Sequence, residues 1–441
     1  MPESYWLETL GCPKNQVDSD KLVGTLLADG YEEADGPENA DLVVVNTCAF
    51  IEAARQESID TILELADSRR AGSRLVVTGC LAERYGSELS DSLPEVDLVA
   101  GFGVPVTLRR RNSFDLLNLP RPAATAPWAY IKVAEGCDRR CGFCAIPSFR
   151  GKQRSRPTDV LLDEVDALGD AVREIVLVAQ DLASYGLDRT APERVARPKG
   201  TPRPIVELIR AVADRVERVR LLYLYPSALD NELVETIVDT GVPYFDLSLQ
   251  HVSRPLVERM RRWGDGEKFL DRIAKIRAAA PDAGLRSSFI LGYPGETEED
   301  HDALLGFLEE AQLDWAGFFT FSEEPGTYAA GLPDPVPAAL ALERLRECSE
   351  LQDRITAVRR ATLVGKTMHV LVDSAGVGRS HREAPEIDGI IHVPTDLEPG
   401  RLLDLVATDA AGPDLWADVP VGADVPVGAD IVVGAAVAVD R

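Results

Sequence analysis

The sequence contains no run of apolar residues that approaches the roughly eighteen needed to cross a membrane as a helix. Its first residues, Met-Pro-Glu-Ser-Tyr-Trp, have neither the basic region nor the apolar region of a secretory signal. Only seven of the 441 residues are cysteine, and an odd number argues against the disulfide framework of a secreted protein. We therefore expect a cytoplasmic protein without membrane contact, in which clustered cysteines are metal ligands or reactive thiols.

Positive charge is scarce as well. The chain has 47 Lys and Arg residues against 73 Asp and Glu residues, which gives a formal net charge of −26. A chain of this charge repels the phosphate backbone of nucleic acids, so contact with RNA would require a local basic patch. A basic partner would be attracted instead.

The chain is nevertheless apolar enough, at 45 %, to bury a large core, and its length of 441 residues predicts about three domains. Residues 1–102 alternate short apolar runs with helical spacing, which predicts an open parallel βαβ domain. Residues 103–127 hold three consecutive arginines, Arg109 to Arg111, and several prolines, and are interpreted as a linker.

From residue 128 to residue 364 the alternation resumes with six strand–helix units, the pattern of an incomplete (βα)6 barrel. Functional groups of such barrels lie at the C-terminal ends of the strands. An insertion at 189–204, rich in Pro and Arg, predicts an exposed loop. Residues 365–441 hold short β-rich runs between Gly and Pro, which predicts a small antiparallel barrel. The expected fold class is α/β with a small β-barrel at the end.

Helical spacing separates the expected strands, for example at Lys21–Asp29 and at 337–363. Two identical hexapeptides, Val419–Asp424 and Val425–Asp430, stand near the end of the chain and receive no functional assignment. The expected strands are Tyr5–Leu10, Leu42–Asn46, Leu75–Thr78, Ala129–Ala134, Glu174–Ala179, Val219–Tyr225, Tyr244–Leu249, Leu285–Leu291, Gly317–Ser322, Thr367–Val372, Gly389–Val393, Leu402–Ala407 and Asp414–Asp418.

Three cysteines with the spacing C-x3-C-x2-C, Cys137, Cys141 and Cys144, follow the first strand of the central part. This short spacing on a strand-end loop lets three thiolates converge on one metal centre. On a four-iron cluster, three thiolates leave one iron open to the amine and carboxylate of a substrate. A structural zinc site normally has four protein ligands, and no fourth Cys or nearby His follows here. A zinc site and a redox thiol pair remain as alternatives.

The segment from Glu135 to Cys144, with Phe143 just before the last cysteine, resembles the signature of the radical S-adenosylmethionine enzymes. The resemblance implies a [4Fe-4S] cluster whose open iron binds S-adenosylmethionine. In that family an electron from the cluster cleaves the cofactor, and the resulting 5′-deoxyadenosyl radical abstracts an unactivated hydrogen.

A second set of cysteines, Cys12, Cys48 and Cys80, has one member after each of the three expected strands of the first domain. The C-terminal ends of parallel strands lie along one edge of a sheet, so we expect the three thiols to meet there. The alternative is that they are three buried cysteines that act only as small apolar residues.

Together the two triads resemble the methylthiotransferases, radical enzymes that insert sulfur and a methyl group into an unactivated C–H bond. The resemblance covers nearly the whole chain and implies two [4Fe-4S] clusters and a C-terminal barrel of the TRAM type. It also places Gln180 and Gly292 near S-adenosylmethionine, although each could instead be a structural turn residue. Four motifs of the family follow the expected barrel strands, at Gln180–Gly186, Ser248–His251, Gly292–Thr297 and Glu324–Thr327.

Two further motifs, Gly11–Asn15 and Ile146–Gly151, resemble one branch of this family, called RimO. This branch modifies the β-carbon of an aspartate in small-subunit ribosomal protein S-twelve, whereas the sister branch modifies an adenosine of transfer RNA. The resemblance implies a basic ribosomal protein as substrate, a reductant such as flavodoxin or ferredoxin, and a sulfur donor.

The charge of Gly365–Arg441 gives a separate argument for this branch. The segment has five basic and thirteen acidic residues, and Trp416 is its only large aromatic. A barrel that grips RNA should be basic and carry stacking aromatics, whereas an acidic barrel suits a Lys- and Arg-rich protein. We therefore expect no transfer RNA partner. The alternatives are a transfer RNA adenosine methylthiotransferase and a non-catalytic zinc or redox-sensing protein.

Overall fold

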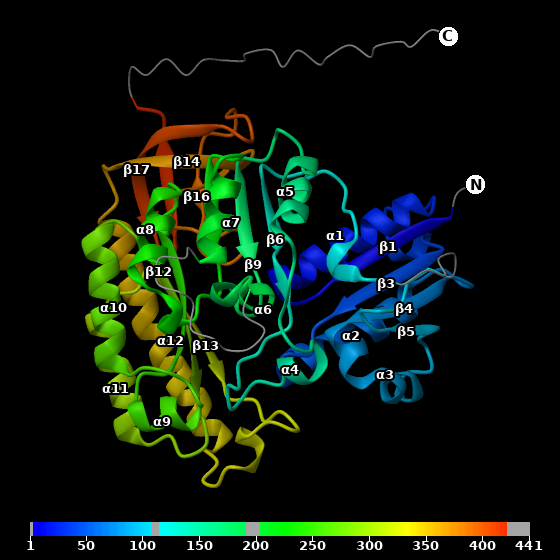
Figure 1. Cartoon of the computed structure of the whole chain (residues 1–441), viewed down its shortest axis with the longest axis horizontal. Helices are drawn as coiled ribbons and strands as arrows, with labels where there is room; N and C mark the ends of the chain where they lie inside the picture. Colours follow the sequence, from blue (N-terminus) through cyan, green and yellow to red (C-terminus); the bar gives the residue numbers. More distant parts are fainter. Residues whose placement is uncertain (1–2, 108–113, 191–202, 421–441) are drawn as a thin grey trace.

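The computed structural model describes residues 3–107, 114–190 and 203–420, and Figure 1 shows that they form three parts. A blue-to-cyan α/β unit lies at one side of a larger green-to-yellow α/β unit, and an orange-to-red barrel covers one end of the latter. Within the described residues, no helix combines the length and apolar composition needed to cross a membrane. The Arg109–Arg111 run lies outside the described residues, as do most of the 189–204 insertion and nearly all of the repeated hexapeptides.

The N-terminal unit is a five-stranded sheet in the order β2-β1-β3-β4-β5, and every pair in it is parallel. Apolar side chains are buried on both of its faces. The parallel βαβ arrangement predicted for this part is therefore found. Its strands are β1 (Ser4–Thr9), β2 (Glu32–Glu33), β3 (Leu42–Thr47), β4 (Arg74–Gly79) and β5 (Leu98–Ala100), and its helices are α1 (Pro13–Ala28), α2 (Glu52–Ser68) and α3 (Cys80–Ser92).

The segment predicted as a linker is not free of the first unit. Leu116, in the short helix η2 (Leu116–Asn118), is buried in a core cluster together with residues of β1 and α1. The ammonium of Lys21 on α1 donates to the carbonyl oxygens of Leu117 and Leu119 at 2.7 Å and 3.2 Å. Residues 116–119 therefore pack against the N-terminal sheet domain.

All six expected strands of the central part are present, in two parallel three-stranded sheets that a single bridge from Leu224 to Leu247 connects. The result is an open, partial barrel. Its strands, in spatial order, are β6 (Trp128–Lys132), β9 (Glu174–Val178), β10 (Arg218–Leu221), β11 (Tyr244–Gln250), β12 (Gly284–Leu291) and β13 (Trp315–Thr320).

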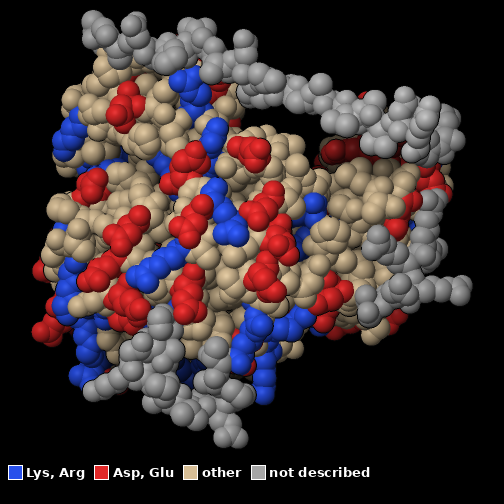
Figure 2. All heavy atoms as spheres, turned by 45° about the horizontal axis from the view of Figure 1, so that its top comes forward, with Lys and Arg blue, Asp and Glu red and all other residues tan. Residues whose placement is uncertain are grey.

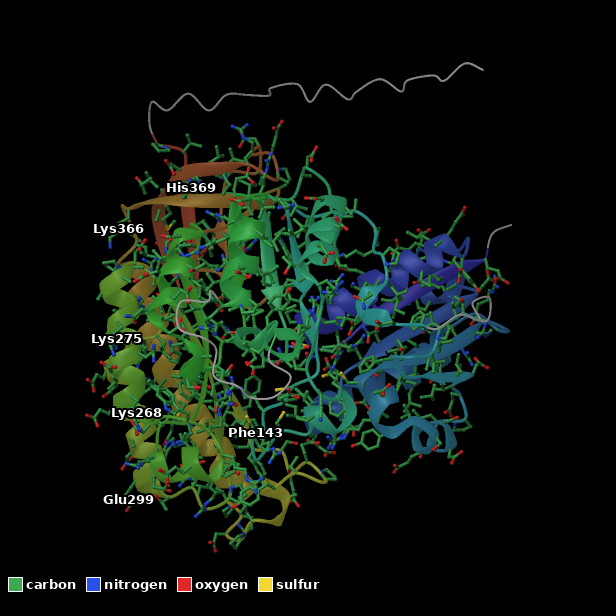
Figure 3. All side chains as sticks on the ribbon, viewed as in Figure 1. Phe143, Lys268, Lys275, Glu299, Lys366 and His369 are labelled. Carbon is green, nitrogen blue, oxygen red and sulfur yellow. The ribbon has the colours of Figure 1, made fainter. Side chains whose placement is uncertain are left out.

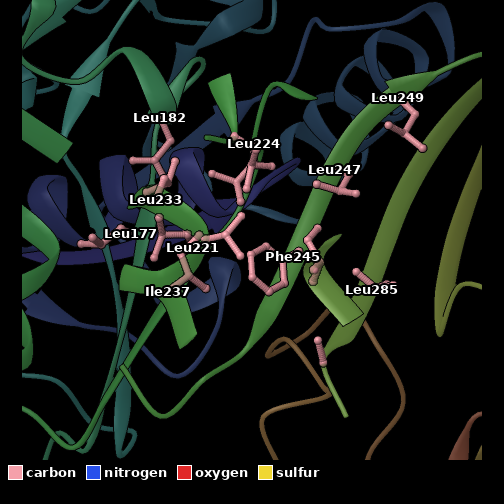
Figure 4. Packing of buried hydrophobic residues seen from close by; sticks show 14 of the residues in the cluster. Leu177, Leu182, Leu221, Leu224, Leu233, Ile237, Phe245, Leu247, Leu249 and Leu285 are labelled. Atoms are coloured by element: carbon pink, nitrogen blue, oxygen red, sulfur yellow. The ribbon is translucent and has the colours of Figure 1, made fainter. Parts of the chain in front are cut away.

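Helices cover the outside of this partial barrel and bury its core. Figure 4 shows Leu221 and Phe245 of β10 and β11 packed beside Leu233 and Ile237 of one covering helix. The helices are α4 (Ile146–Phe149), α5 (Thr158–Ala167), α6 (Leu187–Thr190), α7 (Pro204–Ala213), α8 (Asn231–Asp239), α9 (Arg254–Arg259), α10 (Gly266–Ala279), α11 (Glu298–Ala311) and α12 (Ala338–Ala361), with a small hairpin of β7 (Ala134–Glu135) and β8 (Arg154–Ser155).

The C-terminal part is a closed barrel in the order β14-β15-β16-β18-β17. Its pairs are antiparallel except that β16 and β18 run in parallel. Its strands are β14 (Thr367–Ser374), β15 (Val377–Arg379), β16 (Ile391–His392), β17 (Leu402–Ala411) and β18 (Asp414–Asp418).

The barrel is attached to the N-terminal ends of the central strands by buried polar contacts. Arg220 of β10 is paired with Glu174, the first residue of β9, at 2.7 Å, and Arg379 of β15 is paired with the same carboxylate at 3.2 Å. The indole nitrogen of Trp315, the first residue of β13, donates to the carbonyl oxygen of Arg382 at 2.7 Å. The barrel therefore lies at the end of the central part opposite the functional rim of the strands.

Candidate metal centres

The structure brings Cys12, Cys48 and Cys80 together at the C-terminal edge of the N-terminal sheet. Cys12 precedes α1, Cys48 follows β3, and Cys80 is the first residue of α3. A Cβ on Gly11, whose φ is +97°, would stand 3.1 Å from the sulfur of Cys48, so the chain needs glycine there. Burial, and then the neighbouring charges of Cys80 and Cys12, raise the pKa of the Cys48 thiol to about 12.

Cations stand next to this first triad. Although burial opposes the change, Lys14 and Arg150 hold the pKa of the Cys12 thiol below its usual value. The guanidinium of Arg150 also donates to the sulfur of Cys80 at 2.9 Å. Burial nevertheless raises the pKa of Cys80. Positive charge beside buried sulfur favours thiolates, the form in which cysteine binds metals.

The second triad lies on the loop that follows β6 and β7, at the C-terminal rim of the partial barrel. Gly136 has a φ of +77°, and a Cβ there would meet the carbonyl oxygen of Lys152 at 2.2 Å, so the tight turn before Cys137 requires glycine. Burial raises the pKa of Cys137 to about 11 and that of Cys144 to about 12, and in both cases the charges of neighbouring triad thiols add to the rise. The three thiols therefore share one loop and influence one another electrostatically.

Two arginines flank the second triad. The guanidinium of Arg262 donates to the sulfur of Cys141 at 3.1 Å, and the backbone N–H of Arg139 donates to the sulfur of Cys137 at 3.4 Å. The ring of Tyr225, just beyond β10, has Arg139 at 3.7 Å and Arg262 at 4.3 Å from its centre. Phe143, labelled in Figure 3, packs against an apolar cluster beside this loop.

Neither triad has the geometry of a site for one ion. Across residues 3–107, 114–190 and 203–420, no three His, Cys, Asp or Glu side chains converge closely enough to hold a single metal ion. A structural zinc ion needs four such ligands around one point. An iron–sulfur cluster binds each thiolate through a different iron, so its ligands need not converge on one point.

The two residues expected near S-adenosylmethionine lie at the same rim but in different surroundings. Gln180 follows β9, and its amide nitrogen donates to Glu135 at 3.0 Å, close to the second triad. Its buried amide oxygen has no partner among the described residues. Gly292 follows β12 with a φ of +76° and lines a cavity of about 340 Å³ together with Phe321 and Ala341. That cavity does not include Gln180 or any described cysteine.

A larger cavity, of about 430 Å³, lies between β12, β13, α12 and the barrel, and it contains Arg286 and Asp388 but no cysteine. It is therefore separate from both triads. Cys348 is fully buried on α12, where burial raises its pKa to about 12. His251 is buried as well, and burial lowers its pKa to about 4. Both residues therefore lie in the packed interior, away from the two triads.

A buried polar group that no sequence pattern predicted lies between the two triads. Asn15 donates to the carbonyl oxygens of Leu10 and Thr47 at 2.8 Å and 3.0 Å, and it accepts from Arg150 at 2.9 Å. Glu135 accepts from Arg150 at 2.8 Å. Asn15, Glu135 and Arg150 all stood in motifs noted for resemblance, but no local pattern relates residues this far apart in the chain.

A second contact joins the two α/β units at the rim. Glu324, in a loop after β13, accepts from Arg55 of α2 and from Arg84 of α3, each at 2.6 Å. Its side chain is 2 % exposed. Although burial opposes the change, a hydrogen bond from Ser322 and the two guanidinium groups hold the pKa of Glu324 below its usual value. This contact fixes the first triad relative to the second.

Comparison with known proteins matches all three parts of the chain. Residues 4–101 match the uncharacterized protein family UPF0004, residues 131–308 match the radical SAM superfamily, and residues 364–419 match the TRAM domain. These matches confirm the predicted fold class.

Curated relatives match nearly the full length. A protein of Moorella thermoacetica named ribosomal protein uS12 methylthiotransferase RimO is 42 % identical over 414 residues, which cover 89 % of this chain and 93 % of that protein. Proteins of the same name from Salinispora tropica and Myxococcus xanthus are 40 % and 39 % identical. These matches cover 93 % and 95 % of this chain and 94 % and 92 % of the two relatives.

Among solved structures, the radical S-adenosylmethionine methyltransferase TsrM from Kitasatospora setae, with cobalamin and a [4Fe-4S] cluster bound, has a TM-score of 0.51. The superposition covers 90 % of this chain and 83 % of that one at 15 % sequence identity. At this identity the likeness concerns the fold alone.

Proposed function

The chain belongs to the RimO family of ribosomal protein uS12 methylthiotransferases, and on that premise we propose that it adds a methylthio group to the β-carbon of an aspartate in uS12. The observation that carries the proposal is that two cysteine triads, one from each α/β unit, lie on either side of one buried polar group. Sulfur insertion into an unactivated C–H bond needs a radical route, because no side-chain base can remove that proton at neutral pH.

We propose that each triad holds one [4Fe-4S] cluster, Cys137, Cys141 and Cys144 the radical cluster, and Cys12, Cys48 and Cys80 an auxiliary cluster. An arginine that donates to one sulfur in each set supports this assignment. When bound, the radical cluster with S-adenosylmethionine would supply the hydrogen-abstracting radical, and the auxiliary cluster would supply the sulfur.

The chain's own residues would hold the cofactor and close the site. Gln180 presents an unpartnered buried amide oxygen beside the second triad, which is a free acceptor for the amine of S-adenosylmethionine. Gly292 at the end of β12 leaves room where a Cβ would stand 2.6 Å from the Cβ of Ala341. Both residues are proposed as cofactor contacts.

The barrel supports a basic protein as substrate. Figure 2 shows acidic and basic side chains interspersed over the visible face of the molecule, so the charge of the barrel must be judged from its own residues. Within its described part, Lys366 is the one exposed basic residue. Six acidic residues of the same part are exposed, namely Glu386, Asp396, Glu398, Asp404, Asp409 and Asp418. Exposed acid attracts a Lys- and Arg-rich protein and disfavours transfer RNA.

The proposal includes two further partners and a compartment. A reductant such as flavodoxin or ferredoxin would reduce the radical cluster, and a separate sulfur donor would replace the sulfur that is consumed. We place the reaction in the cytoplasm, because the seven cysteines are free thiols and a reducing compartment keeps them so. We propose the domain bounds 1–102, a linker at 103–127, 128–364 for the radical domain and 365–441 for the barrel.

The test offers the anaerobically reconstituted, reduced chain two substrates, a peptide from the aspartate-bearing loop of uS12 and transfer RNA that lacks the modification. We expect a mass increase on the peptide that matches one methylthio group and none on the RNA. Modification of the RNA alone would contradict uS12 as the substrate and would favour the branch that modifies adenosine in transfer RNA. Chain prepared with Ala at Cys137, Cys141 and Cys144 is the matched control and should modify neither.

A further inference from the structure

The side chain of Arg150 contacts a cysteine of the first triad and a carboxylate beside the second triad. It caps the short helix α4, and its side chain is only 3 % exposed. One branch of the guanidinium donates to the sulfur of Cys80 and to the amide oxygen of Asn15, both at 2.9 Å. The other branch donates to Glu135 at 2.8 Å. Only a planar side chain with several fixed donors can make these contacts together.

Glu135 connects Arg150 to the loop of the second triad. It stands two residues before Cys137, and its carboxylate also accepts from the ammonium of Lys132 at 2.8 Å and from Gln180 at 3.0 Å. Hydrogen bonds therefore link the sulfur of Cys80, through Arg150 and Glu135, to the loop that carries Cys137.

Two cations and two carboxylates make up this buried group. Arg150 and Lys132 face Glu135 and Asp18, and Asp18 is bonded to Lys132 and lies 3.7 Å from Arg150. The ring of Phe102 covers the guanidinium at 4.5 Å. Reduction of a cluster held by the first triad would add negative charge beside Arg150. In such a water-poor place, each positive charge has a large effect on its neighbours.

We propose that Arg150 is a positioning residue that raises the reduction potential of the auxiliary cluster and holds that cluster against the Cys137 loop. Reduction adds negative charge, which a nearby cation and an N–H···S hydrogen bond stabilise, so both make the cluster easier to reduce. The inference rests on the proposed assignment of Cys80 as a cluster ligand.

The experiment is a redox titration of the anaerobically loaded full chain, followed by electron paramagnetic resonance, in a background with Ala at Cys137, Cys141 and Cys144. In that background only the auxiliary cluster contributes a signal. Arg150→Met should move its midpoint potential to a more negative value, and Arg150→Lys should give a smaller shift in the same direction. Lys keeps the charge but cannot bond Cys80 and Glu135 together. The matched control is Arg154→Met, because Arg154 is exposed and pairs with Asp115 at 2.7 Å.

A wild-type potential in Arg150→Met with full iron content would overturn the inference. If Arg150→Met cannot retain the cluster, the test rests on Arg150→Lys, and a wild-type potential there overturns it equally. The proposed function fails in a different way. If Ala at Cys12, Cys48 and Cys80 removed no iron, the cluster assignment itself would be wrong, whatever the Arg150 variants showed.

Discussion

The guanidinium of Arg84 on α3 donates to the carboxylate of Glu324 at 2.6 Å, across the boundary between the two α/β units. Both side chains are nearly buried, at 8 % and 2 % exposure. Arg55 of α2 bonds to the same carboxylate, so one acid from the central part holds two helices of the N-terminal unit. Through this contact the rim of one unit is kept in register with the cysteine edge of the other.

Breaking this contact should loosen the N-terminal unit. In Glu324→Gln, Arg84 loses its carboxylate partner and Arg55 keeps only the exposed Glu52, a loss that costs about 2 kcal/mol. We expect faster proteolysis of the N-terminal unit in the iron-free chain and less methylthiolated peptide per S-adenosylmethionine cleaved. Glu323→Gln is the control, because that neighbour is exposed. Equal proteolysis of the two variants would show that Glu324 does not hold the units together.

The number of clusters can be counted directly. Anaerobic reconstitution should give about eight iron and eight sulfide per chain, because each triad is proposed to hold a separate four-iron cluster. Ala at Cys137, Cys141 and Cys144 should leave about half of the iron, measured by colorimetric assay. Cys348→Ala, at a buried helix position, should leave the iron content unchanged. Tightly bound zinc without sulfide would contradict the assignment.

The two triads should have separable roles. A reduced chain with Ala at Cys12, Cys48 and Cys80 should still convert S-adenosylmethionine to 5′-deoxyadenosine, because the radical site is complete in the central part. It should form no methylthiolated peptide, because the sulfur site is lost. Chromatography of the nucleoside and mass spectrometry of the peptide measure both. Continued methylthiolation by this variant would rule out sulfur delivery at the first triad.

Docking of uS12 should depend on the charge of the barrel. Changing Asp404, Asp409 and Asp414 to Lys should weaken binding of the basic protein, and rising salt should weaken wild-type binding, because salt screens exposed charges beyond about 8 Å at physiological ionic strength. Fluorescence anisotropy of labelled uS12 would measure the dissociation constant.

A matched charge reversal of Asp302, Glu309 and Glu310, exposed on α11, changes the net charge equally. Figure 3 shows Glu299 of that helix and His369 of the barrel strand β14 at opposite ends of the molecule. If both triple variants weakened docking to the same extent, overall charge would be responsible, and the barrel would not be the docking surface.

His251 should make the fold sensitive to mild acid. Burial lowers its pKa to about 4, while an unfolded histidine titrates near 6.5. Between these values the unfolded chain binds a proton that the folded chain does not, so stability is full above pH 6.5 and declines as the pH falls toward 4. We expect the wild-type free energy of unfolding to fall by about 2 kcal/mol more than that of His251→Gln between pH 7.5 and pH 5.

Urea unfolding of the iron-free chain at the two pH values would test this. His369→Gln is the control, because it is the same substitution at an exposed position on β14. Parallel pH profiles for wild type and His251→Gln would contradict the prediction.

Much of the fold was predictable because long strands have clear periodicity. The six central strands were all found, since runs such as Glu174–Val178 are fully buried and stand between helical stretches. The short edge strands β2 and β5 were missed, because two or three residues carry no usable period. Helix α1 begins at Pro13, well before the expected start at Lys21. A proline at the first helical position would have been the signal for that start.

The site was predictable only in its cysteines. Each thiol of the first triad follows a strand, and the topology of parallel sheets brings strand ends together, so its meeting point followed from the sequence. The contacts of Arg150 could not be predicted from the sequence, because they join Asn15 and Cys80 of one unit to Glu135 of the other. How two units pack decides such contacts, and local sequence patterns do not encode that packing.

The attachment of the barrel at the N-terminal strand ends sets a length scale for substrate selection. The cysteine triads lie at the C-terminal ends, and β11, with seven residues, spans roughly 20 Å between the two ends. On the proposed docking, a target held by the barrel meets the reacting site only if its aspartate stands about that far from its basic surface. A peptide from the aspartate-bearing loop reaches the reacting site without contact to the barrel, so on this proposal it should react less efficiently than the full protein. The distance between the barrel and the triads would then favour a folded basic protein over short peptides that carry the same aspartate.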